Sequence, residues 1–179
     1  VLTGDRLRGG DIDFAVAAKH ATAEAVNFMA MHGKGLICLA LTPARALRLG
    51  ISLINPGSDR QSGRPHGRSI EARTGVSTGI SAADRARTIA VAIDPASSGD
   101  DLVSPGHVFP LIAAAGGVQE RPAALEASID LVGRAGAGDA AVICSIMRED
   151  GEMARLEDLA ELIAQHDLAV VDIADLLGA

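Results

Sequence analysis

The sequence predicts a single layered domain of mixed α and β structure, and three observations support this prediction. The 179 residues suit one domain, and 48% hydrophobic with 22% charged residues is an ordinary globular balance. Only 2% of the residues are aromatic, with no Trp or Tyr. The core must therefore be built from Ala, Val, Ile and Leu, as where helices pack on a sheet. Segments with strand character alternate with helical segments, and no internal repeat or linker interrupts residues 1–179.

The first half of the chain carries clear helix boundaries. Thr22 and Thr42 are typical N-cap residues, Pro43 suits a first helical position, and Gly50 suits a C-terminal cap. The apolar run GLICLAL predicts a buried strand. Ser81 begins a capping-box pattern with the Asp three residues later. We therefore expect a helix over 22–33, a strand over 35–41, and helices over 42–50 and 81–93.

Two segments lack a regular hydrophobic period. Residues 55–68 are dominated by Pro, Gly, Ser and Arg, and we expect a long exposed loop there. Residues 98–117 are rich in turn signals, with Pro105 and Pro110 on either side of GHVF. In the remaining part of the chain the pattern predicts a helix over 122–136, a strand over 140–147, a helix over 153–167 and a strand over 168–173.

The charge balance limits the classes of partner. A formal net charge of −7 and a sequence pI near 5.1 oppose general binding to nucleic acid or to anionic membranes, so an anionic ligand would need a local basic pocket. Cys38 and Cys144 lie in apolar runs, where buried reduced thiols are expected, and this indicates a cytoplasmic protein. No apolar stretch approaches the roughly 20 residues of a membrane span. The chain begins at Val1 without Met, which is consistent with a missing N-terminal segment.

The segment GDRLRGGDID, residues 4–13, concentrates charged and flexible residues. Its acids Asp5, Asp11 and Asp13 are suited to a hard cation, and its arginines Arg6 and Arg8 are suited to a phosphate. The glycines either allow a ligand to approach closely or mark side chains that have been lost. The segment is therefore a candidate metal or anion loop.

Three further positions have both a chemical and a structural interpretation. Ser81 begins a helix whose N-terminus favours an anion, but a simple cap explains it equally well. His107 follows a Gly-containing turn, where it is either a ligand or acid–base imidazole, or an ordinary surface histidine. Glu126 lies on an otherwise apolar helix face, so that it either points into a site or occupies a solvated edge.

Several blocks together resemble one enzyme family. They are AVNFMAMHGKGLICLALT, GVSTGISAADRARTI, SPGHVFPL with GGV, and ICSIMREDGEMARL. In this order, from about Arg8 to the C-terminus, the chain resembles the 3,4-dihydroxy-2-butanone 4-phosphate synthase family of riboflavin biosynthesis. The resemblance implies an α+β protein with a three-layer α/β/α domain and a mixed β-sheet. It also implies a homodimer that uses a divalent metal, Mg²⁺ or Mn²⁺, to convert ribulose 5-phosphate into formate and a four-carbon phosphate.

The family's acidic loop, usually Arg-Glu-Asn-Glu-Gly-Asp, reads RGGDID here. Ungapped alignment places Arg8 on the substrate-binding arginine and Gly9 on the glutamate that binds metal. It places Asp11 on the second glutamate and Asp13 on the aspartate, both catalytic positions. The resemblance therefore implies that the metal carboxylate has been lost. In an enzyme that still binds the metal, Asp11 or Asp13 supplies the carboxylate that Gly9 lacks.

Other departures from the family pattern fall at expected site positions. Ser104 replaces the arginine expected at the phosphate, which weakens phosphate binding. The Gly-His-Thr-Glu run keeps only Glu126, with Ala124 at the histidine position, and Ser145 replaces a glutamate.

The retained positions define the expected site. The resemblance makes His107 a metal ligand beside Asp11, makes Glu126 a catalytic acid, and places Cys38 and Ser81 near the substrate. The basic residues of the mid-chain loop, which either rebuild an anion site or are solvated charges, are Arg60, Arg64 and Arg68.

Three functional hypotheses follow. The first is a diverged enzyme that enolises a sugar phosphate or related hydroxyketone with metal assistance, followed by rearrangement or cleavage. The second is a catalytically inactive paralogue kept for binding or dimerisation. The third is ordinary synthase activity on ribulose 5-phosphate. Formate release from ribulose 5-phosphate separates the third from the second.

Overall fold

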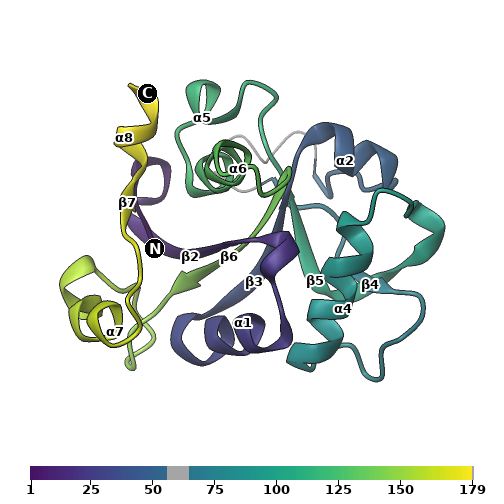
Figure 1. Ribbon diagram of the computed structural model, residues 1–179, viewed down its shortest axis with the longest axis horizontal. Helices are drawn as coiled ribbons and strands as arrows, with labels where there is room; N and C mark the ends of the chain where they lie inside the picture. Colours follow the sequence, from purple (N-terminus) through teal and green to yellow (C-terminus); the bar gives the residue numbers. More distant parts are fainter. Residues whose placement is uncertain (56–64, 179) are drawn as a thin grey trace.

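The computed structural model describes residues 1–55 and 65–178. Its centre is one mixed sheet in the order β4-β5-β3-β6-β2-β1-β7 (Figure 1). β3 runs parallel to β5 and antiparallel to β6, and β6 runs antiparallel to β2. The strands are β1 (Leu2–Asp5), β2 (Asp11–Ala17), β3 (Lys34–Leu41), β4 (Ile70–Ala72), β5 (Leu102–Ile112), β6 (Ala140–Ile146) and β7 (Val171–Asp172).

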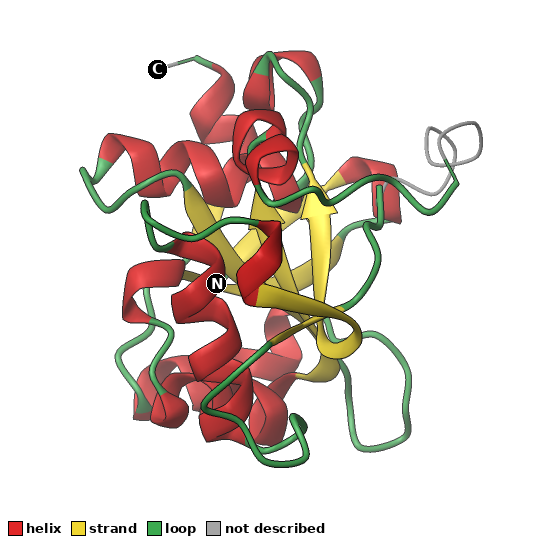
Figure 2. Cartoon of the chain, turned by 90° about the vertical axis from the view of Figure 1, so that its right-hand side faces the viewer, coloured by secondary structure: helices red, strands yellow, loops and turns green. Residues whose placement is uncertain are grey.

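Helices cover both faces of the sheet, which confirms the predicted three-layer α+β architecture (Figures 1 and 2). The α-helices are α1 (Ala23–Phe28), α2 (Pro43–Arg48), α4 (Ala82–Ile93), α5 (Gly117–Glu120), α6 (Ala124–Arg134), α7 (Ala160–Gln165) and α8 (Ile173–Leu177). The short helical turns are η1 (Arg6–Arg8), η2 (Ala18–His20), η3 (Met29–Gly33), η4 (Gly99–Asp101) and η5 (Leu156–Leu159). One face carries α1, α4 and α7, and the other carries α5, α6 and α8.

In the central strands, an uninterrupted apolar run packs against the helices on both faces of the sheet. In β3, Leu39 and Leu41 pack in the core that includes α1 and α4, whereas Cys38 and Ala40 pack in the core under α6. This alternation follows from the two-residue period of a strand. Because both faces are covered, polar side chains within these strands are exceptional and help to locate the site.

The predicted helix starts are confirmed. The side chains of Thr22, Thr42 and Ser81 each accept a hydrogen bond from the backbone N–H three residues later, and Pro43 occupies the first turn of α2. Cys38 and Cys144 are buried and unbridged, as predicted. None of the helices in residues 1–55 and 65–178 has the length and apolar character needed to span a membrane.

Several segments differ from the predictions. The turn-rich segment 98–117 contains the long strand β5. Pro110 has no N–H to donate, but its carbonyl accepts a hydrogen bond from the Gly67 N–H, so the proline still takes part in the sheet. In the expected loop 55–68, residues 65–68 are described, and Pro65 and Gly67 are buried against the sheet. The predicted helix 153–167 is divided into η5 and α7, and the strand 168–173 is limited to Val171–Asp172 before α8.

Candidate active site around Arg8

Arg8 is the centre of a polar cluster at the start of β2. Its Nη1 donates to Asp13 Oδ2 at 2.7 Å, and its Nη2 donates to Asp11 Oδ2 at 2.9 Å. Nη2 also donates to Ser145 Oγ at 3.1 Å, and Nη1 lies 3.9 Å from Asp5 Oδ2. These five residues are called the Arg8 cluster below. Three carboxylates surround one guanidinium, so the cluster keeps a net negative charge.

The local sequence explains how these charges come together. Asp5 ends β1 and Asp11 begins β2, and the two are paired across the strands. Gly9 and Gly10 connect η1 to β2 with φ values of +68° and +84°, which glycine adopts without steric cost. The Gly10 N–H donates to the Asp5 carbonyl at 2.8 Å and closes the turn. Arg155 donates to the carbonyls of both glycines and holds the turn from outside.

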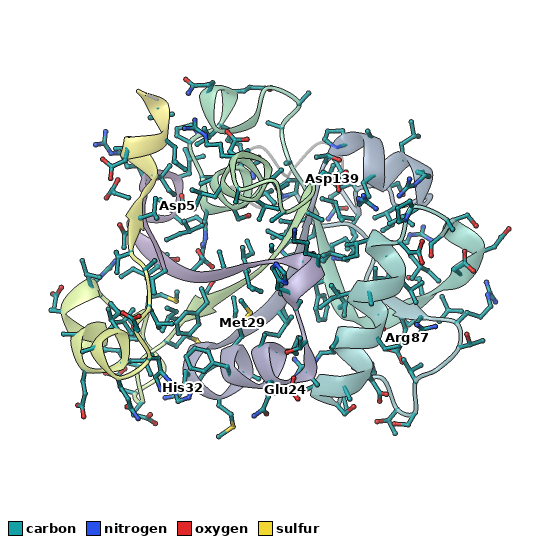
Figure 3. The ribbon with its side chains drawn as sticks, viewed as in Figure 1. Asp5, Glu24, Met29, His32, Arg87 and Asp139 are labelled. Carbon is teal, nitrogen blue, oxygen red and sulfur yellow. The ribbon has the colours of Figure 1, made fainter. Side chains whose placement is uncertain are left out.

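Burial differs among the three aspartates. Asp13 is fully buried, and its Oδ1 accepts a hydrogen bond from Ser145 Oγ at 2.9 Å. Asp5 is 1% exposed, and its Oδ2 accepts from the Ala124 N–H at 2.9 Å, whereas its Oδ1 has no hydrogen-bond partner within residues 1–55 and 65–178 (Figure 3 labels Asp5). The Asp11 side chain keeps 17% exposure. Asp11 is therefore the cluster aspartate most open to a ligand.

The structure thus brings Arg8, Asp11 and Asp13 together, as the sequence predicted for their neighbourhood. It adds Ser145, which the family resemblance gives only as the replacement of a glutamate, and Asp5, to which the resemblance assigns no role. The usable signal for Ser145 was a hydroxyl within an otherwise apolar buried strand. The position of Ala124 beside Asp5 also shows that the start of α6 borders the cluster.

His107 is not part of the Arg8 cluster. Its Nδ1 lies 2.7 Å from Glu71 Oε2, and its backbone N–H donates to the same oxygen at 3.1 Å. Between β5, which carries His107, and β2, which carries Asp11, lie β3 and β6. Three strand spacings amount to about 14 Å. The predicted arrangement of His107 and Asp11 around one ion is therefore not found.

The expected divalent metal does not fit the described residues. Residues 1–55 and 65–178 contain no group of three or more His, Cys, Asp or Glu side chains placed to hold an ion. At the Arg8 cluster, Asp11 Oδ2 and Asp13 Oδ2 already accept hydrogen bonds from Arg8. No step proposed below for this chain passes through a metal ion.

Glu126 lies inside the protein rather than at the cluster. Its Oε1 accepts from the Ala114 N–H at 2.9 Å and lies 3.2 Å from Arg121 Nε, while its buried Oε2 has no hydrogen-bond partner in the part of the chain that the structure describes. Burial raises the pKa of this carboxyl, and the Ala114 N–H and Arg121 act in the opposite direction. Glu126 also lines a hollow of about 540 Å³ between α2 and α6, whose wall includes Thr42 and Asp130.

The remaining predicted residues lie elsewhere. Cys38 is fully buried, and Ser81 Oγ is engaged as the cap of α4. Asp84 of the same helix accepts hydrogen bonds from the backbone N–H and side chain of Ser77, and these donors lower its pKa. Arg68 is exposed. The other two basic residues of the mid-chain loop, Arg60 and Arg64, lie outside the described residues.

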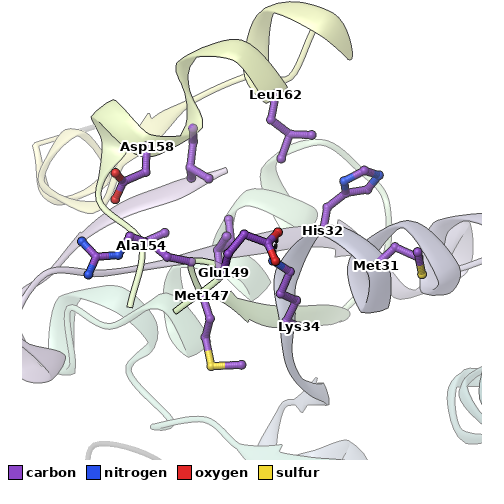
Figure 4. Close-up of a pocket in the computed structure, with 11 residues that line it drawn as sticks. Met31, His32, Lys34, Met147, Glu149, Ala154, Asp158 and Leu162 are labelled. Atoms are coloured by element: carbon purple, nitrogen blue, oxygen red, sulfur yellow. Dashed lines mark hydrogen bonds and ion pairs between the residues drawn. The ribbon is translucent and has the colours of Figure 1, made fainter. Parts of the chain in front are cut away.

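A second hollow, of about 370 Å³, lies between η3, the end of β6 and the η5–α7 segment (Figure 4). His32 and Leu162 point toward it from opposite sides, and Lys34 forms an ion pair with Glu149 at its edge. None of the predicted site residues lines this hollow. We therefore treat this hollow as separate from the Arg8 cluster.

Comparison with known proteins identifies close relatives. Residues 1–179 match the family model for 3,4-dihydroxy-2-butanone 4-phosphate synthase. The chain is 47% identical over 179 residues to the riboflavin biosynthesis protein RibBA of Aquifex aeolicus, covering 99% of this chain and 44% of that protein. It is 45% identical over 177 residues to the 3,4-dihydroxy-2-butanone 4-phosphate synthase of Pseudomonas syringae, covering 99% and 48%. The chain thus spans about half the length of these curated relatives.

Solved structures give the same result. RibBX, a two-domain 3,4-dihydroxy-2-butanone 4-phosphate synthase from A. baumannii, superimposes with a TM-score of 0.89 at 40% identity, covering 98% of this chain and 52% of that one. A 3,4-dihydroxy-2-butanone 4-phosphate synthase in complex with two magnesium ions superimposes with a TM-score of 0.92 at 32% identity, covering 99% and 88%.

Proposed function

The chain belongs to the 3,4-dihydroxy-2-butanone 4-phosphate synthase family, and from this premise we propose that it converts ribulose 5-phosphate into formate and 3,4-dihydroxy-2-butanone 4-phosphate. Identities of 45–47% to relatives named for riboflavin biosynthesis or for this synthase support the proposal over the full matched length. They favour ordinary family chemistry over a changed substrate, since nothing in the comparisons points to another reaction.

The Arg8 cluster is the observation that supports catalysis. Enolisation of a hydroxyketone needs a base for the proton and a positive charge beside the developing enolate oxygen. Asp11, the partly exposed carboxylate, is the proposed base. The Arg8 guanidinium supplies a fixed positive charge next to it. Asp13 and Ser145 orient the guanidinium from the buried side.

A phosphosugar also needs a site for its phosphate. Ser104 offers a hydroxyl where the family resemblance places an arginine, so binding at this position is expected to be weaker. The exposed Arg68, just before β4, is the described basic residue that we propose as a second phosphate contact. Because β4 and β5 are separated from β2 by β3 and β6, we propose that Ser104 and Arg68 reach the substrate bound at Asp11 from the second copy of the expected homodimer. We expect a homodimer, as in the family, and sedimentation equilibrium measures this directly.

A specific observation supports a second candidate, a non-catalytic member with a binding or dimerisation role. Gly9 has no carboxylate where the resemblance expects one that binds metal, and the space next to its Cα is open, with no atom within 4 Å of a Cβ built there. Removal of a preorganised group of this kind commonly costs about 10² to 10³ in rate. The loss of two such groups, at Gly9 and Ser104, motivates this candidate.

Formate release from ribulose 5-phosphate tests the proposal. We expect turnover by the wild-type chain, and a fall in kcat of about 100-fold in Asp11→Asn, because a positioned general base contributes at least this much. Asp150→Asn is the matched control, since this exposed aspartate pairs with Arg148 away from the cluster, and it should retain full activity.

The Gly9→Glu/Ser104→Arg double variant separates the candidates. A silent wild type with an active double variant would establish the non-catalytic candidate and place the defect at these two positions. Silence in both proteins, with other sugar phosphates also unreactive, would reject synthase activity for this chain.

A further inference from the structure

We infer that Arg8 is the resident cation of the aspartate cluster, so that this chain holds no divalent metal at Asp11 and Asp13. The family resemblance implies a divalent metal, but the carboxylate oxygens of Asp11 and Asp13 that would bind it already accept hydrogen bonds from Arg8. Its consequence for turnover rests on the proposed function, whereas its consequence for metal binding does not.

The guanidinium occupies the space that a shared ion would need. Nη1 lies 2.7 Å from Asp13 Oδ2, and Nη2 lies 2.9 Å from Asp11 Oδ2. A divalent ion bound by the same two oxygens would lie about 2.0 to 2.6 Å from each, which overlaps the position of these nitrogens. The metal and the Arg8 side chain therefore exclude one another at this place.

Few carboxylate oxygens remain for a second ion nearby. Asp13 Oδ1 accepts from Ser145, and Asp5 Oδ2 accepts from Ala124. Asp5 Oδ1 is buried and has no hydrogen-bond partner among the described residues. Among the cluster oxygens the partly exposed Asp11 carboxylate is the remaining metal ligand, which is fewer than the about six to eight oxygens that Ca²⁺ takes. Mg²⁺ is usually held by one or two carboxylates together with water and substrate phosphates, so Asp11 without a second protein ligand makes no dedicated Mg²⁺ site in the absence of substrate.

The sequence also gives Arg8 an advantage over dissolved ions. It lies three residues from Asp11 and five from Asp13, so its charge is delivered with the aspartates on one short turn. Such tethering corresponds to an effective concentration of about millimolar or more, comparable with free Mg²⁺. The Arg8 side chain is only 13% exposed and is held by Ser145 as well, which limits its exchange with solvent ions.

Mn²⁺ titration of the full chain, followed by electron paramagnetic resonance, tests the inference. We expect no saturable site in the wild type up to about 1 mM Mn²⁺, the range of weak sites. Arg8→Gln should create a saturable site, and Mn²⁺ should raise the Tm of this variant by about 5 °C. Arg6→Gln is the matched control, since Arg6 is exposed in the same η1 turn and should behave as wild type.

Each outcome decides the inference. Saturable Mn²⁺ binding by the wild type that Asp11→Asn removes would overturn it, as would the absence of Mn²⁺ binding in a folded Arg8→Gln variant. If Arg8→Gln does not fold without metal, recovery of its folded spectrum on adding Mn²⁺ is expected, and no recovery would count against the inference. If the wild-type chain releases formate from ribulose 5-phosphate, we expect EDTA to leave the rate of release unchanged. Failure of the proposed function appears separately, as absence of formate whatever the Mn²⁺ result.

Discussion

Arg45 should contribute strongly to stability because one guanidinium ties three elements together. Its Nη1 donates to the carbonyl of Ile93 at 2.9 Å and to that of Ala92 at 3.4 Å, at the C-terminal end of α4. Its Nε and Nη2 donate to Asp139 Oδ1 at 2.9 and 2.6 Å, just before β6 (Figure 3 labels Asp139). The Arg45 side chain is 11% exposed, whereas Asp139 is 50% exposed. Arg45→Met keeps the apolar stem and removes all these bonds.

The expected loss of stability can be worked out bond by bond. The short bond to Ile93 is charge-assisted, favoured by the helix dipole, and accounts for about 1.5 to 3 kcal/mol of the free energy of unfolding. The longer contact to Ala92 adds little. The half-exposed pair with Asp139 adds about 0.5 kcal/mol. We therefore expect Arg45→Met to cost about 2 to 3 kcal/mol and to lower Tm by about 5 to 10 °C.

Urea denaturation of the variants checks this value. Arg48→Met is the matched control, three residues along the same helix. Its guanidinium donates one long hydrogen bond, to the Asp94 carbonyl at 3.5 Å, so we expect a change in stability of less than about 0.5 kcal/mol. The double variant Arg45→Met/Asp139→Asn should show a coupling energy of about 0.5 kcal/mol. A loss below about 1 kcal/mol for Arg45→Met, or an equal loss for Arg48→Met, would refute the reasoning.

Three further predictions follow from single residues. The raised pKa of Glu126 means that the folded chain keeps a proton that the unfolded chain releases above about pH 4.5, so stability contributed by this group falls as pH rises from there. Glu126→Gln should flatten this slope in urea midpoints measured from pH 4.5 to 8, and an unchanged slope would contradict it. The pKa of Asp84 is lowered in the folded chain, so the stability that this group contributes is present at neutral pH and is lost as the pH falls. Asp84→Asn should therefore lower the Tm at neutral pH, and the difference in Tm from wild type should shrink below about pH 3.8. Gly9→Ala should cost about 1 to 2 kcal/mol in urea denaturation from its φ of +68° alone, because the added methyl meets no atom within 4 Å, and a neutral result would show that the turn relaxes.

Local signals allowed the central layers to be predicted. The runs that became β3 and β6 are apolar except for Lys34 and Gly35 at the start of β3 and Ser145 in β6, and the caps Thr42 and Ser81 depend on residues three positions away. β5 was missed because Pro105 and Pro110 counted against a strand. The hydrogen bonds that keep it in the sheet come from β3 and from Gly67, which are distant in sequence.

In the candidate site, too, contacts between residues close in sequence could be predicted, whereas contacts between distant residues could not. Arg8, Asp11 and Asp13 lie within six positions, so their contact could be anticipated from the loop alone. The contribution of Ser145 depends on a strand pairing 132 residues away from Asp13. The partner of His107 is Glu71 on a neighbouring strand, 36 residues away, and a chemical role assigned by resemblance does not reveal such a pairing.

The strand order has a consequence for how the chain folds during synthesis. β1 and β2 form a local hairpin, but β2 joins the sheet only through β6, and β1 pairs on its other side with β7. Phe14 can pack against Phe28 of α1 early, but the burial of Ile12 and Phe14 is complete only after β6, residues 140–146, has been synthesised. Such a high contact order predicts slow folding and makes the nascent first half a natural client for chaperones.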